Sequence, residues 1–585
     1  MVLLLMSKIE WVALLFIVGV VILCWLLFFG AALFGYGLGT FLSVIFTTAV
    51  IFLAIKKTSH LVQATKPEYQ LLIFVLAWGV LFLGLLQTRM LEQKSEGWYS
   101  GGATWGDLAL HTSFISKFSI QKTFDLTSSI YAQQETHYPL LYDFFTAQLV
   151  RQGVTVRGAL IYSTLTLLLA SLVLFYKIVF SLTKQLEGVW IACCLFCFNG
   201  GFGFYYFWQD FRANKLLFNY SHIAEREIHF SNTITDMFLP QRGIVLGFAL
   251  ALVVLRLWQV AKNNRSIWLS TSVLIGLTPL IHVHTFLILL GCLTWVQLVR
   301  LQQKKTTFVQ AVLLLLPAVV LGTFQLIWMG IGEQSGQFIK VIHGWMEPTG
   351  PLSIFWLKNL GLELFFLLIG NLLVFWGVKQ KTVLHHLIPP LVLVFLLGNL
   401  LSFQPHIYDN IKLFFYTHLI TAIFTTVVLL KITRKSRMLA AVIFILLVLS
   451  GVISVIRESK SSYLLAANED LLFAKQVRTN TTDSDIFLTA DSHYHPIPML
   501  AGRSTVLGYR GWLWTHGVAY SQTEAEVQKI YAGAHNAHEL LKKYNISYVV
   551  IGNQERQQFT INENYFYQNF AVVLQEKNRV VFAVR

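Results

Sequence analysis

The feature that most constrains this chain is a series of long apolar segments that recurs from residue 11 to residue 456. A helix that crosses a bilayer needs roughly 20 mostly apolar residues. The candidate spans are 11–30, 40–55, 70–87, 158–181, 188–206, 242–260, 267–281, 283–300, 308–330, 354–377, 385–402, 411–430 and 438–456. Charged residues make up only 12% of the chain, whereas soluble domains carry about 25%. The sequence therefore excludes a soluble globular protein and predicts a polytopic α-helical membrane protein with about 13 spans.

Lysine and arginine gather at alternate connections between these spans, as in 56–66, 300–305 and 431–437. Cytoplasmic loops of membrane proteins carry such an excess. The pattern predicts a cytoplasmic N-terminus and a C-terminus on the other side of the membrane, which is extracellular, periplasmic or luminal. It also accounts for the net charge of +15 without a nucleic-acid partner.

The chain divides into a membrane domain, 1–456, and a polar tail, 457–585. The outer loops of the membrane domain are 88–157, 207–241 and 331–353, apart from one short connection. In the tail, DIFLTA (485–490) and ISYVVIG (546–552) are β-rich runs, and AVVLQEKNRVVFAV at the end reads as a hairpin. Helical periodicity over 522–544 separates the two runs. The tail is therefore predicted to be an extracytoplasmic α/β domain.

The first candidate site lies in GGATWGDLALHTSF, residues 101–114. Asp107 and His111 are four residues apart and share one face of a helix. A carboxylate oriented by a histidine can act as a general base. The alternative is an interfacial helix whose Asp and His face water. His137 and Tyr138 in the nearby segment 135–145 offer polar groups beside an aromatic face, or simply pack there.

Three basic side chains stand at the outer ends of spans. Arg242 suits a lipid phosphate, which a guanidinium grips with paired N–H donors, although snorkelling is the simpler reading. His282 and His284 lie in an apolar turn and need partners, either a phosphate or carboxylate or the adjacent helix ends. Lys358 and Glu363, in one span, are expected to form an internal ion pair.

Glu225, Glu227 and His229 are residue types that bind metals, and like Asp236 they precede the span 242–260. Their spacing places them on one face only in a strand, so a solvated charged loop is the favoured reading. We predict no metal site, and leave a divalent cation open as a cofactor. In the tail, Arg510 and Trp512 belong to GYRGWLWTHG (508–517), which could stack on a sugar, clamp a phosphate or dock the tail onto the bundle.

This layout resembles the GT-C superfamily of multipass membrane glycosyltransferases, in a prokaryotic branch that uses lipid-phosphate-linked sugars. The segments that carry the resemblance are WGDLALH at 105–111, HYPLLY at 137–142, VLGYRGW at 506–512 and YNISYVVIG at 544–552. Two features depart from it. The first outer loop follows the third span rather than the first, and it contains no Asp-x-Asp, which argues against the metal-dependent oligosaccharyltransferase branch.

The resemblance implies an inverting transfer of a sugar from a polyprenyl-phosphate donor to an acceptor hydroxyl in the cell envelope. Asp107 would be the general base, with His111 beside it, and the tail would bind a glycan, lipid or protein acceptor. From their chemistry alone, Arg242, His282 and His284 are assigned to the donor phosphate. The substrate-binding candidates are His137, Tyr138, Asp236, Arg510 and Trp512, and Asp236 or Glu227 could supply a second acid.

Two other functions remain open. A transporter or flippase of a lipid-linked substrate favours internal repeats and charges at the bilayer midplane, and the sequence has neither feature. A non-catalytic membrane assembly protein would tolerate Asp107→Asn without loss of function.

Overall fold

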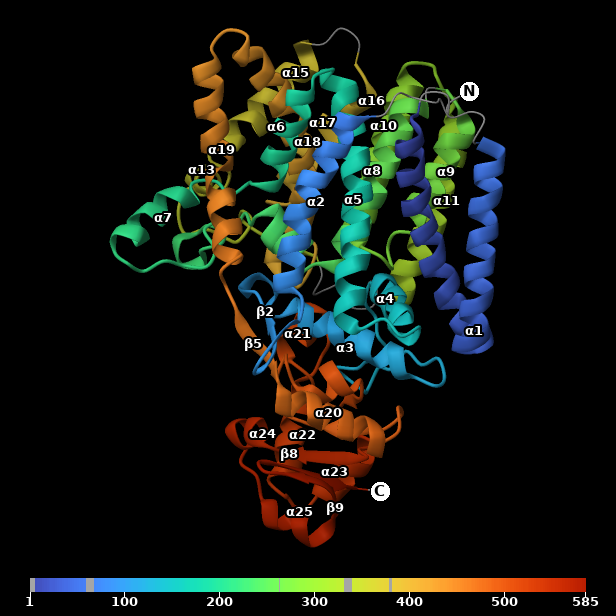
Figure 1. Cartoon of the computed structure of the whole chain (residues 1–585), viewed down its shortest axis with the longest axis vertical. Coiled ribbons are helices and arrows are strands. Elements are labelled where there is room, and N and C mark those ends of the chain that lie inside the picture. The colour runs from blue at the N-terminus through green and yellow to red at the C-terminus, as the bar shows by residue number, and fades with distance from the viewer. Residues whose placement is uncertain (1–5, 59–67, 262, 331–338, 378–380, 585) are drawn as a thin grey trace.

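The computed structural model describes residues 6–58, 68–261, 263–330, 339–377 and 381–584. Figure 1 shows a bundle of roughly parallel helices above and a separate α/β domain at the C-terminal end. Part of the predicted outer loop 331–353 lies outside the described residues.

Within the described residues, eight helices are long and apolar enough to cross a membrane, or up to nine if one bent pair counts as a span. They are α1 (Lys8–Thr58), α2 (Tyr69–Arg89), α5 (Val156–Thr183), α8 (Arg242–Ala261), α10 (Val283–Gln302), α11 (Phe308–Trp328), α18 (Ile411–Thr433, with the turn before it) and α19 (Arg437–Glu458). The predicted helical membrane protein is confirmed, and thirteen complete crossings are not.

The helix α1 contains two of the predicted spans, 11–30 and 40–55, joined at Gly35. The backbone at Gly35 has φ 73°, a conformation that glycine adopts without strain. The hydroxyl of Ser43 donates to the carbonyl of Leu26 at 2.7 Å, so the two arms lie side by side, as Figure 1 shows. The two arms of α1 therefore correspond to two of the predicted spans.

Three other predicted spans form helices shorter than a bilayer requires. The segments 188–206, 267–281 and 385–402 contain α6 (Leu186–Cys197), α9 (Arg265–Gly276) and the pair α16 (Val383–His386) and α17 (Ile388–Leu397). Each of α6 and α9 has 12 residues, which is about 18 Å of helix. These elements complete the bundle around longer neighbours without crossing the full hydrocarbon thickness alone.

The predicted span 354–377 is broken. Its two halves, α13 (Leu352–Leu360) and the segment Glu363–Gly377, which includes α14 (Glu363–Phe365) and α15 (Asn371–Gly377), meet at 112°. The expected pairing of Lys358 with Glu363 is wrong, because the bend separates them. Lys358 lies 3.1 Å from Glu227 and Glu363 lies 2.5 Å from His418.

The C-terminal domain contains a five-stranded sheet in the order β7-β6-β8-β10-β9. Its strands are β6 (Ile486–Leu488), β7 (Ser504–Thr505), β8 (Tyr548–Ile551), β9 (Ala571–Glu576) and β10 (Arg579–Ala583). The helices are α20 (Asn468–Asn480), α21 (Arg510–Thr515), α22 (Ser521–Tyr531), α23 (Ala537–Lys543), α24 (Asn553–Gln558) and α25 (Glu563–Asn569). The two β-rich runs identified in the sequence form β6 and β8, and the terminal hairpin is β9–β10.

A second sheet fastens this domain to the first outer loop. Strand β5 (Tyr463–Ala467) pairs with β2 (Gly97–Ser100), which pairs with β1 (Glu92–Lys94). At Gly97 a Cβ would lie 2.1 Å from the carbonyl oxygen of Ala466, so the close approach requires glycine. The same loop provides α3 (Asp107–Ile120) and α4 (Leu141–Arg151).

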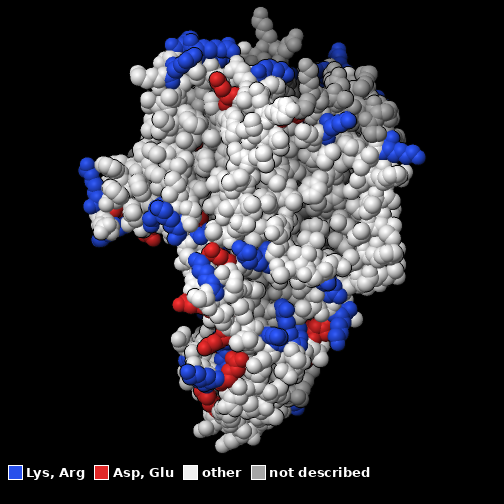
Figure 2. Space-filling model, viewed as in Figure 1, with Lys and Arg blue, Asp and Glu red and all other residues white. Residues whose placement is uncertain are grey.

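The two ends of the bundle differ in charge. Figure 2 shows lysine and arginine gathered at the end opposite the C-terminal domain, where Lys304, Lys305 and Lys435 are exposed. The large polar loops and the tail share the other end (Figure 1). This arrangement supports the predicted topology, while the side of the membrane on which the tail lies stays a prediction.

Candidate functional site

A cavity of about 350 Å³ lies where the helical bundle meets the C-terminal domain. Its wall combines the start of α3, residues 128–139 of the first outer loop, the start of α8, the turn before α10, the segment 404–412 and residues 512–518 of the tail. Segments that are distant in sequence therefore converge on one partly open cavity. Of the predicted site residues, the cavity brings together Asp107, His137, Tyr138, His282, His284 and Trp512.

Asp107 begins α3, where the helix dipole favours a carboxylate. The side-chain amide of Gln241 donates a hydrogen bond to Asp107 Oδ2 at 2.6 Å. Burial raises the pKa of Asp107, and the negative charge of Asp409 adds to this, against the opposing effects of His111, Lys412 and the Gln241 hydrogen bond. Asp107 is therefore a carboxylate whose affinity for a proton exceeds that of a solvated aspartate.

Lys412 and Asp409 lie in the cavity wall at the start of α18, with Lys412 Nζ 3.1 Å from Asp409 Oδ1. Neither residue was predicted from the sequence. The available signal was a lysine at the C-terminal-domain end of a span, preceded three positions earlier by an aspartate. Together they give the cavity one ammonium group close to Asp107, whose pKa it lowers.

His282 and His284 lie at the N-terminal end of α10, with ring centroids 5.3 Å apart. The backbone N–H of Thr285 donates to His282 Nδ1 at 3.2 Å. A neutral imidazole that accepts at Nδ1 carries its proton on Nε2. That Nε2 is buried without a hydrogen-bond partner among the described residues, and the residue lines the cavity. His282 thus holds an N–H group without a partner among the described residues, buried beside the cavity rather than on its open surface.

Aromatic rings from the first outer loop and the tail close one side of the cavity. The ring of Tyr138 lies 4.7 Å from that of His516 and 5.5 Å from that of Phe114, measured between centroids. Burial lowers the pKa of His516 to about 4, so this imidazole is neutral at pH 7. His137 packs against Trp328 at 5.9 Å. These contacts make the tail part of the cavity wall.

Arg242 and His111 lie behind the cavity, in a buried network. Arg242 is 3% exposed. It donates through Nε to Asp143 Oδ1 at 2.8 Å and through a terminal nitrogen to Thr146 at 2.5 Å, and its guanidinium stacks on Tyr142. His111 Nδ1 lies 2.6 Å from the other oxygen of Asp143. Neither residue is in the cavity wall, so both act on it only through their neighbours.

Asp236 and Arg510 are also absent from the cavity wall. Asp236 accepts hydrogen bonds from Asn219, Thr235 and the backbone of Asn232, and burial raises its pKa to about 6. Arg510 forms ion pairs with Asp491 and Glu524 inside the tail. Both residues support loops that surround the site.

No group of three or more His, Cys, Asp or Glu residues in the described part of the chain could hold a metal ion. Among the residues considered as ligands by type, Glu227 binds Thr349 and Lys358 instead.

The fold is similar to that of the oligosaccharyltransferase of Archaeoglobus fulgidus. The structure of that enzyme tethered to an acceptor peptide with the NVT sequon has a TM-score of 0.50 and 12% identity, over 83% of this chain and 70% of that chain. The apo form gives a TM-score of 0.50 and 13% identity with the same coverage. No family model and no curated protein matches the chain. The similarity confirms the expected GT-C fold, and at this identity it concerns the fold alone.

Proposed function

We propose that this chain of GT-C fold is a membrane glycosyltransferase that moves a sugar from a polyprenyl-phosphate donor to an acceptor hydroxyl. The observation that carries the proposal is that one cavity wall brings together a carboxylate of raised pKa, Asp107, and a lysine, Lys412, beside a histidine, His282, whose Nε2 has no partner among the described residues. A proton acceptor beside a phosphate-binding set is what glycosyl transfer from a phosphate requires.

The donor phosphate is assigned to the end of the cavity formed by Lys412, His282 and His284. An ammonium group and a neutral imidazole N–H both bind phosphate oxygens by hydrogen bonds, and those from the ammonium are charge-assisted. Hydrogen-bond donors that are already in place around the phosphate stabilise the charge that develops as it leaves. The polyprenyl chain would extend from this end between the spans.

The acceptor would bind on the side of Asp107, His137, Tyr138 and the tail. Asp107 takes the proton of the acceptor hydroxyl as its oxygen forms a bond to the anomeric carbon. The bond from that carbon to the phosphate oxygen breaks on the opposite side, and its electron pair leaves with the phosphate. The sugar configuration is therefore inverted. Trp512 and His516 would hold the acceptor, which can be a glycan, lipid or protein.

His111 and Arg242 take positioning roles in this scheme. Arg242 donates hydrogen bonds to Asp143, Thr146 and Thr164. Because these bonds occupy its guanidinium group, Lys412 rather than Arg242 is proposed to bind the phosphate. Through Asp143 it fixes His111, one turn after Asp107 on α3. Asp236 and Arg510 likewise act by holding their loops rather than by contact with substrate.

The reaction would take place at the outer face of the plasma membrane, as the charge distribution of the loops favours. There the donor would be presented in the outer leaflet and the product would join the cell envelope.

The test is mass spectrometry of the lipids that co-purify with the protein in mild detergent. Wild type is compared with Asp107→Asn, Lys412→Met and Arg242→Ala, and with Lys475→Met as a control, because Lys475 is exposed on α20. We expect a polyprenyl phosphate or its glycoside in wild type and in the control, its depletion in Lys412→Met, and accumulation of the glycoside in Asp107→Asn.

The competing functions predict other results. Bulk phospholipid alone in every sample would remove the lipid-linked donor and favour an assembly role. A lipid-linked sugar that co-purifies equally with wild type and Asp107→Asn, together with its movement across proteoliposomes in both, would indicate a transporter or flippase.

A further inference from the structure

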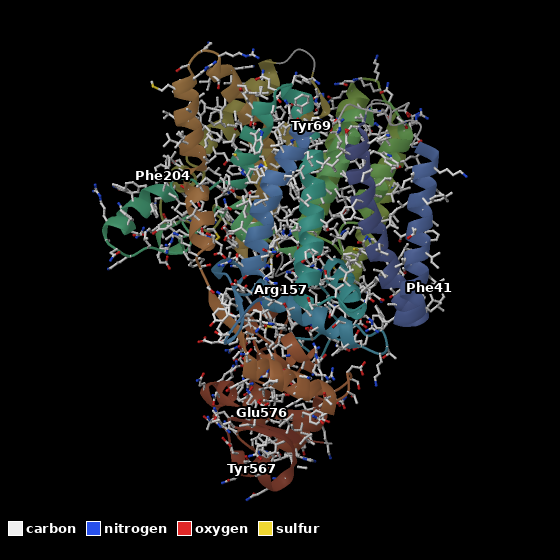
Figure 3. The ribbon with its side chains drawn as sticks, in the orientation of Figure 1. Phe41, Tyr69, Arg157, Phe204, Tyr567 and Glu576 are labelled. Carbon is white, nitrogen blue, oxygen red and sulfur yellow. The ribbon has the colours of Figure 1, made fainter. Side chains whose placement is uncertain are left out.

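A projection from the side of the bundle exposes a large apolar surface that the proposed reaction does not use. It consists of α7 (Gly203–Arg212) and the residues that follow it to Phe218. Figure 1 shows α7 leaving the bundle sideways, and Phe204, labelled in Figure 3, marks its beginning. The exposed large side chains of the projection are Tyr205, Trp208, Phe211, Leu216, Leu217 and Phe218. Exposed large apolar side chains that gather in one short segment mark a binding face, whereas single ones scattered over a surface are ordinary.

Hydrogen bonds to α19 fix the height of this projection along the bundle. The backbone N–H of Phe204 donates to Ser450 Oγ at 2.8 Å, and that of Tyr220 donates to Ser454 Oγ at 3.1 Å. Arg457 Nε donates to the carbonyl of Leu217 at 2.7 Å. Ser450 to Arg457 is about 10 Å of helix. The projection therefore lies along the last two turns of a membrane-crossing helix.

The charges of the projection suit the same position. Between residues 203 and 218 the only acidic residue is Asp210, which is buried and forms an ion pair with Arg226. Arg212 and Lys215 are exposed, and the guanidinium of Arg212 lies 5.0 Å above the ring of Trp208. Aromatic residues beside exposed cations are the composition of helices that lie in a lipid headgroup layer.

We propose that residues 204–218 form an interfacial segment that binds the bilayer leaflet on the side of the C-terminal domain. Trp208 and Phe211 enter the boundary between headgroups and acyl chains, while Arg212 and Lys215 bind the phosphates of anionic phospholipids. The surface is continuous with α19, whose Ile445 and Ile456 are exposed at the flank of the bundle. This inference concerns the lipid surface and does not depend on the proposed reaction.

The segment is also connected to the cavity. The ring of Phe218 packs against Gly102, where an added Cβ would lie 2.9 Å from it, and Gly102 begins the turn that leads to Asp107. Asn219, the next residue, donates to Asp236 at 3.1 Å. Seating the segment in the headgroup layer thus sets the depth of the cavity relative to the membrane surface.

The experiment uses the full chain with a cysteine introduced at Trp208 or Phe211 and labelled with an environment-sensitive nitrobenzoxadiazole dye. Lys475→Cys on α20 is the matched exposed control. Four of the native cysteines are buried and Cys194 is partly buried, and the labelled unsubstituted protein gives their background. Each protein is reconstituted in phosphatidylcholine vesicles with and without phosphatidylglycerol and with nitroxide-bearing lipids.

We expect Trp208→Cys and Phe211→Cys labels to be quenched several-fold more by shallow nitroxide lipids than the control, and to be protected from aqueous iodide. Replacing Arg212 and Lys215 with glutamine should remove any increase in quenching caused by phosphatidylglycerol. Labels open to iodide and insensitive to nitroxide lipids would overturn the proposal. Labels already shielded in detergent, in a particle of twice the expected protein mass, would overturn it in favour of a second copy of the chain.

Discussion

His111 Nδ1 lies 2.6 Å from Asp143 Oδ2, and both side chains are almost fully buried. The other oxygen of Asp143 accepts from Arg242 at 2.8 Å. The aspartate therefore joins the helix that begins at Asp107 to the helix that begins at Arg242. Because each of its oxygens is engaged, His111 is held in one orientation behind the cavity and is not free to rotate into it.

This network predicts a characteristic pattern of stability. Arg242→Met alone leaves a buried carboxylate beside His111, and Asp143→Leu alone leaves a buried guanidinium. Breaking a buried pair costs about 3–5 kcal/mol, whereas replacing both partners with apolar residues is often close to neutral. The double variant should therefore unfold later in a thermal-shift assay than Arg242→Met.

Additive losses in this cycle would contradict a coupled network. As a control, Lys177→Met removes a partner of Glu68 that lies at the bundle edge and is less buried, so its effect should be smaller.

Asp107→Asn should reduce the rate of sugar transfer by about 10²–10⁴-fold, the usual contribution of a general base. Asparagine keeps the size of the side chain and can still bond to Gln241, so the fold should persist. Single-turnover transfer from the co-purified donor is the measurement. Glu135→Gln is the informative comparison, because Glu135 lines the same cavity. A large loss in Glu135→Gln with none in Asp107→Asn would assign the base to Glu135.

The raised pKa of Asp107 predicts the acid limb of the pH profile. A general base acts in its deprotonated form, so raising its pKa moves the loss of kcat/KM on acidification to a higher pH than a solvated aspartate would give. His516, whose pKa is lowered to about 4, offers a control: His516→Asn should leave the limb in place. If His516→Asn removes it, the limb belongs to the imidazole.

Lys412→Met should weaken donor binding and slow transfer by roughly 10²–10³-fold, the size expected for one preorganised donor at a developing charge. Lys412→Arg keeps the charge and should recover part of the loss. Inhibition of transfer by inorganic pyrophosphate measures phosphate binding, and so separates the loss of donor binding from the slower transfer step. Equal inhibition in wild type and Lys412→Met would place the phosphate elsewhere.

Helix positions followed from the sequence because burying a backbone in lipid leaves few alternatives to a helix. The lengths of the helices could not be predicted from local sequence at positions where the chain bends. Glycine at 361 allows φ 56°, and the sharp turn there pairs Lys358 and Glu363 with different partners. The predicted pair failed because proximity in sequence was mistaken for proximity across a break.

Local sequence likewise selected only some of the residues that line the cavity. Asp107 stands in a recognisable local segment, whereas Lys412 resembles any lysine that snorkels at a span end. Lys412 can be recognised as part of the site only from its position beside Asp409 and Asp107, and Asp107 lies in another loop. Arg242 was selected from the sequence for the donor phosphate, but its partner Asp143 is 99 residues away in sequence, and no local pattern connects the two.

The pairing of β2 with β5 also bears on how the protein is made. Strand β2 (97–100) cannot pair with β5 until residues 463–467 have been synthesised. When they have been, residues 512–518 of the cavity wall have still to be added. A growing chain that has placed the helices up to α19 in the membrane therefore has a cavity that is still open to water at Asp107. The cavity would be complete only after residues 512–518 have been made and folded, so a chain that stops before them would be inserted in the membrane yet inert.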